Sequence, residues 1–387
     1  MMNNILPALP TDKIPAKSSG YFFMLHEDMW RLDKNNNISV GMIHDLLDPE
    51  TLSGFLHTLS FYARNLSAGY TRHIFLCFLD MIRATKATRI DDLMLIGYRS
   101  SLDEAHEHHL GPVSVLLRKW HKLGYPGVSK NVVCLLEGWR LKGGRKGDAV
   151  KRLDPLEGPL TDNELQAFNE AVVRAYEKSV ITIAQLAMAL SISHTGRRSI
   201  QISQLRVVDI LCGENEKGEP FYVLNVPRAK QRNSFFRESF KPYAMTLELW
   251  AVLSAQARNA VTLVENRLGI ELQEADRQQI PLFPDLDVLA TIQSPYEFCQ
   301  LLATDKLHIA ASVITKTLHL IVEESDIRSE RTGDLLHINA RRFRYTTGTR
   351  AAREGFGELV IAELLDHTDT QNAGVYIKNI PEHVKKL

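Results

Sequence analysis

The feature that most constrains the fold of this chain is a break in its pattern between residues 141 and 160. The segment LKGGRKGDAVKRLDPLEGPL holds four glycines and two prolines, a composition that interrupts helices and strands. With 387 residues in all, the chain is long enough for two domains. We therefore predict a domain boundary near residue 150, with a linker over residues 142–160.

The part of the chain before this break reads as a small helical bundle over residues 51–141. Apolar residues recur at intervals of three and four in TLSGFLHTLSFYARNL, TRHIFLCFLDMIRAT and GPVSVLLRKWHKLG, which is the spacing of one helix face. The chain begins with a stretch rich in Pro, Lys and Ser, and such a stretch is typical of a disordered or loosely docked lead-in. The order of residues 1–50 therefore stays open.

The part after the break, residues 161–387, combines helices with a small sheet. Thr161-Asp162-Asn163-Glu164 is typical of a capped helix start, and apolar periodicity continues from it to about Ser193. Further on, FYVLNVPRAKQRNSFFRESFKPYAMT reads as two strands around a turn. The predicted fold class is therefore mainly α, with a helical N-terminal domain and an α+β C-terminal domain that holds a small β-sheet.

Positive charge gathers around the break, although the formal net charge of the chain is zero. Between Gly111 and Leu153, ten lysines and arginines stand against only Glu137 and Asp148. Clustered positive charge is the footprint expected of a DNA-binding surface, whereas the alternative is a solvated helix face and loop. We favour DNA, and apart from Lys130 the ten are the predicted DNA-binding residues: Arg118, Lys119, Lys122, Arg140, Lys142, Arg145, Lys146, Lys151 and Arg152.

Composition predicts a cytoplasmic protein that does not enter a membrane. No apolar run approaches the roughly 18 to 20 residues that would span a bilayer. The first residues, MMNNILPALPTDKIPAKSSG, lack the basic-then-apolar layout of a signal peptide. The four cysteines stand singly in apolar contexts, which favours reduced thiols over disulfides or a zinc site.

The last fifty residues carry groups suited to phosphodiester chemistry. The segment RRFRYTTGTRAAREG places Arg341 and Arg344 three positions apart, and LLDHTDTQNAGVYIK places His367 nine residues before Tyr376. Arginine forks can hold the oxygens of a phosphate in transfer, and a tyrosine hydroxyl can displace an ester oxygen. Tyr345 also stands beside basic residues, but the C-terminal position and the spacing from His367 favour Tyr376 as the nucleophile.

These segments resemble the active-site motifs of the tyrosine recombinase, or phage integrase, family. The usual signature is roughly H-x-x-R-H-T with a later G-H or G-W before the tyrosine; Arg344-Tyr345-Thr346 fills the first slot and Asp366-His367 the second. Upstream, HTGRRSIQISQLRVVDI at residues 194–210 resembles T-G-x-R-x-x-E-L-x-x-L-x-x-x-D-I. On that register Arg198 is the first catalytic arginine, and Arg197 is one residue out of register.

The resemblance also implies a lysine on a hairpin after this motif. Lys230 lies near the tip of the predicted hairpin, and Lys241 in its second strand is the runner-up. Two positions depart from the family pattern. Arg341 stands where histidine is usual. Its guanidinium is permanently charged, so this side chain cannot accept a proton at neutral pH. Gln201 stands where an acidic residue is usual, at a position that orients other groups and does not itself react.

The function implied by the resemblance is site-specific DNA recombination through a 3′-phosphotyrosine intermediate. Family analogy favours service to a mobile element. It implies double-stranded DNA as the partner, a homotetramer on paired sites and possible accessory recombination proteins. The helical core-binding domain would close with the catalytic domain around the duplex. The implied catalytic residues are Arg198, Lys230, Arg341, Arg344, His367 and Tyr376, with Tyr376 as the nucleophile.

Two alternatives remain open at this stage. One is a type IB topoisomerase-like enzyme that nicks and reseals DNA as a monomer. The other is a DNA-binding accessory or regulatory protein whose site has decayed, as Arg341 and Gln201 would suggest. We predict neither a metal nor a cofactor, because the run of histidines and glutamates over residues 104–109 matches no ligand spacing and no Walker loop is present.

Overall fold

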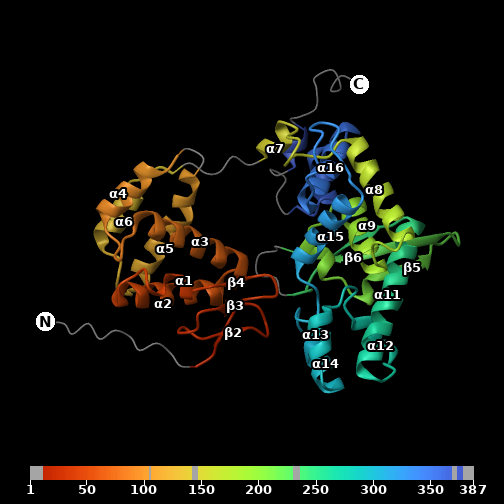
Figure 1. Cartoon of the computed structure of the whole chain (residues 1–387), viewed down its shortest axis with the longest axis horizontal. Coiled ribbons are helices and arrows are strands. Elements are labelled where there is room, and N and C mark those ends of the chain that lie inside the picture. The colour runs from red at the N-terminus through yellow and green to blue at the C-terminus, as the bar shows by residue number, and fades with distance from the viewer. Residues whose placement is uncertain (1–11, 104–105, 142–146, 230–235, 368–372, 378–387) are drawn as a thin grey trace. The chain divides into compact units, whose positions relative to one another are not determined.

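The computed structural model describes residues 12–103, 106–141, 147–229, 236–367 and 373–377 (Figure 1). The chain divides into two compact units, Met1–Arg145 and Lys146–Leu387. Helices dominate both units and the strands form small antiparallel sheets, so the predicted fold class is confirmed. Within the described ranges, no helix combines the length and the apolar character needed to cross a membrane.

The first unit opens with two short β-hairpins. They pair β1 (Ile14–Pro15) with β2 (Phe22–Phe23) and β3 (Trp30–Arg31) with β4 (Asn37–Ile38). The ring of Trp30 is fully buried and stacks on Phe23, with ring centroids 4.3 Å apart. The sequence left the order of residues 1–50 open; from Asp12 onward these residues contribute to the hydrophobic core of the first unit.

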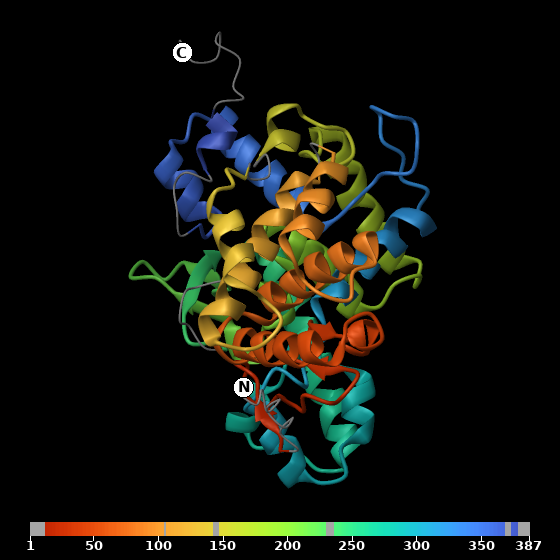
Figure 2. The ribbon, with the colours of Figure 1, turned by 90° about the vertical axis from the view of Figure 1, so that its left-hand side faces the viewer.

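Helices form the body of the first unit. They are α1 (Gly41–His44), α2 (Pro49–Asn65), α3 (Ala68–Thr85), α4 (Asp92–Ser101), a 3-10 turn η1 (Glu107–His109), α5 (Leu110–Leu123) and α6 (Lys130–Glu137). The side chains of Asp48 and Ser67 cap the first turns of α2 and α3, since each accepts hydrogen bonds from backbone N–H groups that lack a helical partner. Helix α5 packs against α2, α3 and α6 (Figure 2). Trp120 of α5 is fully buried beside the stacked rings of Phe55 and Phe78.

A three-stranded antiparallel sheet lies in the second unit. Its strands are β5 (Ile210–Glu214), β6 (Pro220–Pro227) and β7 (Phe240–Ala244), in the order β5-β6-β7. Leu224 and Val226 of the central strand are fully buried, because residues two apart in a strand face the same side. The pairing of β6 with β7 confirms the hairpin predicted from the sequence.

Helices surround this sheet and complete the second unit. They are α7 (Asp148–Lys151), α8 (Asp162–Glu177), α9 (Ile183–Thr195), α10 (Ser199–Ser203), a 3-10 turn η2 (Val207–Asp209), α11 (Leu247–Leu268), α12 (Glu274–Gln279), α13 (Leu286–Thr291), α14 (Pro295–Leu302), α15 (Ala311–Glu324), α16 (Ala340–Arg353), α17 (Glu358–Leu364) and α18 (Gly374–Ile377). The helix start predicted at Thr161 is confirmed by a reciprocal capping box with Glu164. The apolar stretch after it forms two helices, α8 and α9.

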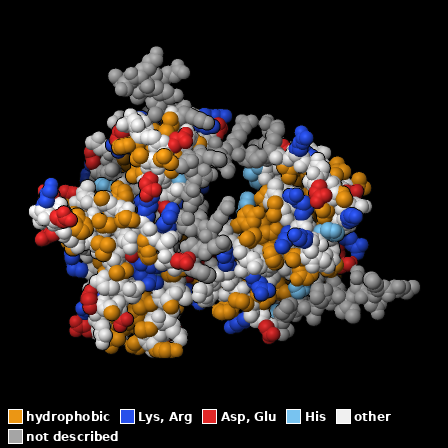
Figure 3. Space-filling model, turned by 180° about the vertical axis from the view of Figure 1, so that it is seen from behind, with side chains coloured by type: hydrophobic (Ala, Val, Ile, Leu, Met, Phe, Trp, Pro, Cys, Tyr) orange, Lys and Arg blue, Asp and Glu red, His pale blue; other side chains and the backbone are white. Residues whose placement is uncertain are grey.

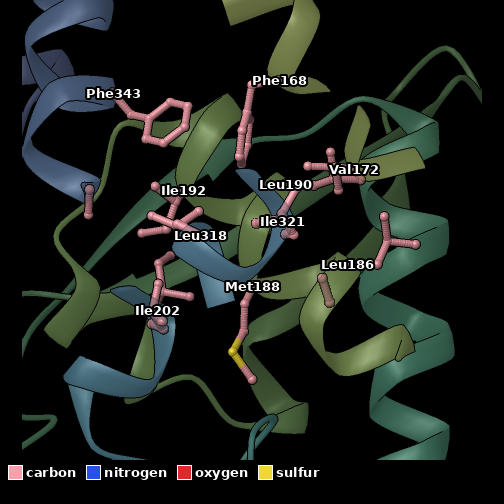
Figure 4. Packing of buried hydrophobic residues seen from close by; sticks show 14 of the residues in the cluster. Phe168, Val172, Leu186, Met188, Leu190, Ile192, Ile202, Leu318, Ile321 and Phe343 are labelled. Atoms are coloured by element: carbon pink, nitrogen blue, oxygen red, sulfur yellow. The ribbon is translucent and has the colours of Figure 1, made fainter. Parts of the chain in front are cut away.

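Helix α9 is the centre of the second unit. Every residue from Leu186 to Ser193 is buried, which is the pattern of a helix with neighbours on all sides. Figure 4 shows Leu186, Met188, Leu190 and Ile192 among side chains of α8, α15 and α16. This central packing fixes where α9 ends, and the functional candidates begin directly after that end.

The predicted linker contains a structural element that the sequence did not reveal. Residues Asp148–Lys151 form α7, and its Val150 is buried in a small core with Ala351, Ile361 and Tyr376. Glycines and prolines on both sides obscure this single helical turn in the sequence. The segment therefore belongs to the second unit and contributes to the core around Tyr376.

Candidate active site

The turn between α9 and α10 positions the first arginine candidate. Gly196 ends α9 with a φ of +58°, a left-handed conformation that favours glycine. A Cβ at this position would lie 2.6 Å from Oγ1 of Thr347, so the close approach to α16 also requires glycine. The chain then directs Arg197 inward and places Arg198 at the start of α10, where Oε1 of Gln201 accepts the Arg198 N–H at 3.2 Å.

Helix α16 positions the second group of candidates. The side chain of Asn339 caps its N-terminus by accepting two backbone N–H groups. Arg341, Arg344 and Gly348 follow at helical spacing and share one face. The Arg344 side chain is 6% exposed, and its guanidinium donates to the carbonyl oxygens of Gly196, at 3.3 Å, and of Leu365. Arg344 therefore ties the end of α9 to the end of α17, whereas Arg341 is exposed.

His367 lies three residues after the end of α17. Asp366 reverses the chain with a φ of +52°, and the His367 N–H then donates to the carbonyl oxygen of Ala362 at 2.8 Å. This is a tight ending of a helix in which the residue after the cap adopts the left-handed conformation. The ending holds the imidazole beside the arginines of the neighbouring segments.

Tyr376 lies on α18 and is only 4% exposed. Its ring packs directly against Gly348 of α16: a Cβ at Gly348 would lie 2.7 Å from Cε1 and 2.8 Å from Cζ of Tyr376. The ring of Tyr345 is a further neighbour, with centroids 6.4 Å apart. The position of the Tyr376 ring therefore depends on glycine at position 348, where a larger residue would clash with it.

These segments enclose one pocket of about 790 Å³. Five of the six predicted catalytic residues line it: Arg198, Arg341, Arg344, His367 and Tyr376. They come from three stretches far apart in sequence, and all belong to the second unit. The pocket thus has cationic donors, an imidazole and a phenol within one space, which is a donor set suited to a phosphate group.

Burial and charge act together on the groups of this pocket. Burial, followed by repulsion from Arg198, lowers the pKa of Arg344 to about 9. Burial also lowers the pKa of Arg198, and the nearby Asp366 carboxylate opposes that change. For Tyr376, burial raises the pKa above its usual value, while Arg344 and Arg198 act in the opposite direction. The free site therefore holds an un-ionised phenol among cations that are costly to bury.

The other lysine and arginine candidates have different positions. Lys230 lies outside the described residues. The runner-up, Lys241, forms an ion pair with Glu363 at 2.6 Å and does not line the pocket. Arg197 is 2% exposed and does not line the pocket either; its guanidinium carbon lies 5.8 Å from the centroid of the Tyr243 ring.

The predicted DNA-binding residues of the first unit lie mainly on α5. Arg118 and Lys122 are exposed on this helix, and Lys119 lies over the ring of Phe61 with its amino group 3.8 Å from the centroid. Arg140 is also exposed. On the face seen in Figure 3, basic and acidic side chains are interspersed with hydrophobic ones.

The remaining predicted DNA-binding residues surround the boundary between the units. Lys142, Arg145 and Lys146 lie outside the described residues. Lys151 and Arg152 are exposed at the end of α7, and Arg152 pairs with Asp148 at 3.1 Å. No structural observation tests the DNA-binding role of any of these residues, so it stays a prediction.

Sequence reasoning missed two residues that shape the site. Gly348 provides the surface on which Tyr376 packs, and Val150 of α7 supports the same core. A signal for Gly348 exists in the sequence, because a glycine inside a helix costs about 1 kcal/mol relative to alanine and usually has a packing reason. Its position four residues after Arg344 places it on the face of the arginines.

Comparisons with known proteins support the fold. No family model matches the chain, and no curated protein matches it. The solved post-cleavage complex of XerH site-specific recombinase bound to palindromic difH substrate is similar, at 15% identity and a TM-score of 0.51, covering 88% of this chain and 89% of that one. The chain has the fold of this recombinase.

Two further solved structures are similar at lower scores. The pre-cleavage complex of XerH bound to difH has 14% identity and a TM-score of 0.49, over 89% of each chain. A lambda integrase dimer bound to a COC′ core site has 14% identity and a TM-score of 0.47, over 88% of this chain and 80% of that one.

Proposed function

We propose that this protein is a site-specific DNA recombinase that cuts and rejoins strands through a 3′-phosphotyrosine intermediate at Tyr376. The observation that carries the proposal is the gathering of three arginines, His367 and Tyr376 around one pocket. The likeness of the fold to a recombinase solved in complex with its DNA substrate supports it. Neither observation depends on close sequence similarity.

In the proposed reaction, Oη of Tyr376 attacks the scissile phosphorus and forms a phosphotyrosine bond. The bond from phosphorus to the 5′ oxygen breaks, and that oxygen leaves with a proton from Lys230. The phenol proton passes to solvent as the phenolate attacks. The later attack of a 5′ hydroxyl from a partner strand reverses these steps, so that joining requires no outside energy source.

The cations of the pocket have two roles in this scheme. Arg198, Arg344 and His367 donate to the non-bridging phosphate oxygens, where negative charge must be stabilised, and Arg341 adds a fourth donor. The same cations favour the phenolate of Tyr376, and this offsets part of the effect of burial on its pKa. Because Arg341 is exposed at the mouth of the pocket, it is suited to meet the DNA backbone first.

The proposal extends to partners and organisation. The partner is double-stranded DNA, bound in part by the helical core-binding domain of residues 51–141 and its basic belt, while residues 161–387 form the catalytic domain. Assembly as a homotetramer on paired sites, help from accessory recombination proteins, service to a mobile element and a cytoplasmic location complete the proposal. These four points rest on the family resemblance alone.

Covalent trapping tests the proposed chemistry directly. Purified protein is mixed with labelled DNA from around its own gene, including nicked suicide substrates, and the reaction is quenched in detergent. We expect a DNA-linked protein band for the wild type and none for Tyr376→Phe. Tyr345→Phe is the matched control, because this tyrosine lines the same pocket; it should still form the band.

The same assay separates the alternatives. A covalent band that persists in Tyr376→Phe would reject the assignment of the nucleophile. DNA retardation in a gel with no band for the wild type would favour a decayed DNA-binding protein. Relaxation of supercoiled plasmid by a monomer, with no exchange between paired sites, would favour the topoisomerase-like enzyme.

A further inference from the structure

A buried carboxylate, Asp366, lies at the centre of the site without lining the pocket. It is 1% exposed and adopts a φ of +52°, a conformation that favours glycine, although aspartate tolerates it. A charged residue in a buried left-handed position carries two costs, the backbone strain and the desolvation of the carboxylate. Contacts that use both carboxylate oxygens oppose these costs.

The two oxygens of Asp366 connect separate parts of the site. Oδ1 accepts the Nε–H of Arg228 at 2.7 Å, and Oδ2 accepts an Nε2–H of Gln201 at 3.1 Å. Gln201 is fully buried; its Nε2 also donates to the carbonyl of Pro227, and its Oε1 receives the Arg198 N–H. The carboxylate thus links the segment before His367 to the segment that holds Arg198.

Arg228 extends this link to the hairpin between β6 and β7. It is the first residue after β6, and its N–H donates to the carbonyl oxygen of Ser239 at 2.8 Å, which closes the base of the hairpin. Lys230 follows two residues later in the sequence. The ion pair between Arg228 and Asp366 therefore fastens the hairpin base to the turn that bears His367.

Asp366 also provides negative charge that acts on the buried arginines. Burial lowers the pKa of Arg197 and of Arg198, and in both cases the Asp366 carboxylate is the first group that opposes the change. The usual family pattern has an acidic residue at the position of Gln201 and a glycine at the position of Asp366. In this chain position 366 carries the buried carboxylate and position 201 carries a neutral amide that donates to it.

We propose that Asp366 is a positioning residue of this site, whose carboxylate aligns the hairpin base, Gln201 and the His367 segment with one another. It performs the orienting role from position 366 that an acidic residue at position 201 would otherwise perform. The inference rests on the proposed strand cleavage for its activity readout, but the alignment can also be measured without DNA.

The central variant is Asp366→Gly, because glycine adopts a positive φ without strain. The matched control is Asp326→Gly: Asp326 also follows a helix with a positive φ of +46°, but it is exposed and pairs only locally with Arg328 at 2.9 Å. Both substitutions remove one carboxylate from a left-handed position of the same unit. Circular dichroism should show that both proteins keep their helical content.

Hydrogen exchange measured by mass spectrometry tests the alignment in the DNA-free protein. We expect Asp366→Gly to accelerate exchange in peptides that cover residues 197–203 and 236–244, and Arg228→Gln to accelerate it in the second of these. Asp326→Gly should leave both peptides unchanged. Wild-type exchange rates in Asp366→Gly would overturn the inference, whatever the activity of the protein.

Single-turnover cleavage of a suicide substrate tests the consequence for the reaction. We expect Asp366→Gly to slow formation of the covalent adduct on the order of 10- to 100-fold, by analogy with groups that orient metal ligands. The dissociation constant for DNA should change little, because the carboxylate does not line the pocket. Adduct formation at the wild-type rate would overturn the positioning role and leave the proposed function intact.

Moving the carboxylate back provides the sharpest version of the test. Gln201→Glu alone places two carboxylates about 3.1 Å apart and should slow cleavage. Gln201→Glu in the Asp366→Gly background should instead restore part of the lost rate, because one carboxylate is again present. Effects of the same sign in both backgrounds would overturn the inference. If the wild type forms no adduct, the proposed function fails and the exchange measurements alone decide this inference.

Discussion

Two groups of buried arginines in the second unit differ in how their charge is balanced. Around Glu164, Arg331 donates at 2.7 Å and the fully buried Arg342 lies at 3.6 Å, with Ser329 also bonded to the carboxylate. Around the pocket, Arg197, Arg198 and Arg344 form no ion pair with any residue that the structure describes. The buried carboxylate of Asp366 accepts its hydrogen bonds from Arg228 and Gln201 instead.

The difference separates an arginine that stabilises the fold from one that is available to a ligand. Arg342 and Arg344 are two residues apart on α16 and are both buried. Because α16 turns them to different sides, one meets a carboxylate and the other meets only carbonyl oxygens and further cations. A group of buried cations that forms no ion pair with a described residue is suited to bind an anion, and the proposed anion is the scissile phosphate.

The largest effect is expected when the arginines around Glu164 lose their carboxylate. Glu164→Ala would leave Arg331 and Arg342 buried without their carboxylate, and the loss of one partner from a buried ion pair costs about 3–5 kcal/mol. Urea unfolding measures the change. Glu170→Ala on the same helix is the control, since Glu170 is exposed and its partners, Gln166 and Arg174, lie on the same helix surface; its urea midpoint should not move measurably. Equal midpoints for the two variants would contradict the structural role.

The next largest effect is expected when the arginines around the pocket lose one member. Arg344→Ala should lower the cleavage rate about 10²- to 10³-fold, which corresponds to the loss of one donor to a developing oxyanion, while DNA binding remains measurable. Single-turnover adduct formation gives the rate. Arg350→Ala is the control on the same helix, because Arg350 is half-exposed and lies near Asp162. A cleavage rate for Arg344→Ala within threefold of the wild type would remove Arg344 from the proposed site.

A smaller effect concerns the binding of an anion to the pocket. Inorganic sulfate should raise the melting temperature of the wild type, because an anion that binds only the folded state stabilises it, by about 2.7 kcal/mol at a concentration 100 times its Kd. Arg344→Ala should show a weaker response, and Arg350→Ala a response like the wild type. Identical sulfate responses in all three proteins would place the binding elsewhere.

The smallest effect is expected in the pH profile of cleavage. Burial raises the pKa of Tyr376, so the phenolate fraction, and with it the rate, should increase with pH. Guanidinium groups keep their proton throughout this range, so Arg344 should not limit the increase. Single-turnover rates between pH 6.5 and 10 test this rise. A plateau that begins near pH 6.5 would instead make His367 the proton acceptor.

The sequence was most informative where the structure depends on local pattern. The capping box at Thr161 and the hairpin of β6 and β7 were predicted, because capping residues and strand alternation act over a few positions. The gathering of Arg198, Arg344 and Tyr376 was predicted only through the family resemblance. Nothing local in these segments brings them together; the packing of α9 against α16 does so.

The residues that the sequence did not reveal are those defined by contacts across long separations. Gly348 has its role only because Tyr376 packs on it, and Val150 only because α7 folds onto α16 and α17. The sequence named Asp366 only as the residue before His367, and its bonds to Arg228 and Gln201 join positions 138 and 165 residues away. Such pairings cannot be read from spacing in a single chain.

The burial of Tyr376 against Gly348 has a consequence for the protein before it meets DNA. A phenol that is un-ionised and almost fully covered is a poor reagent toward any small phosphate ester that diffuses into the pocket. If Tyr376 is the nucleophile proposed above, the packing of its ring keeps it unreactive toward phosphate esters in the unbound protein. Strand cleavage would then begin only when Tyr376 moves away from Gly348. This requirement would restrict DNA cleavage to the DNA-bound complex.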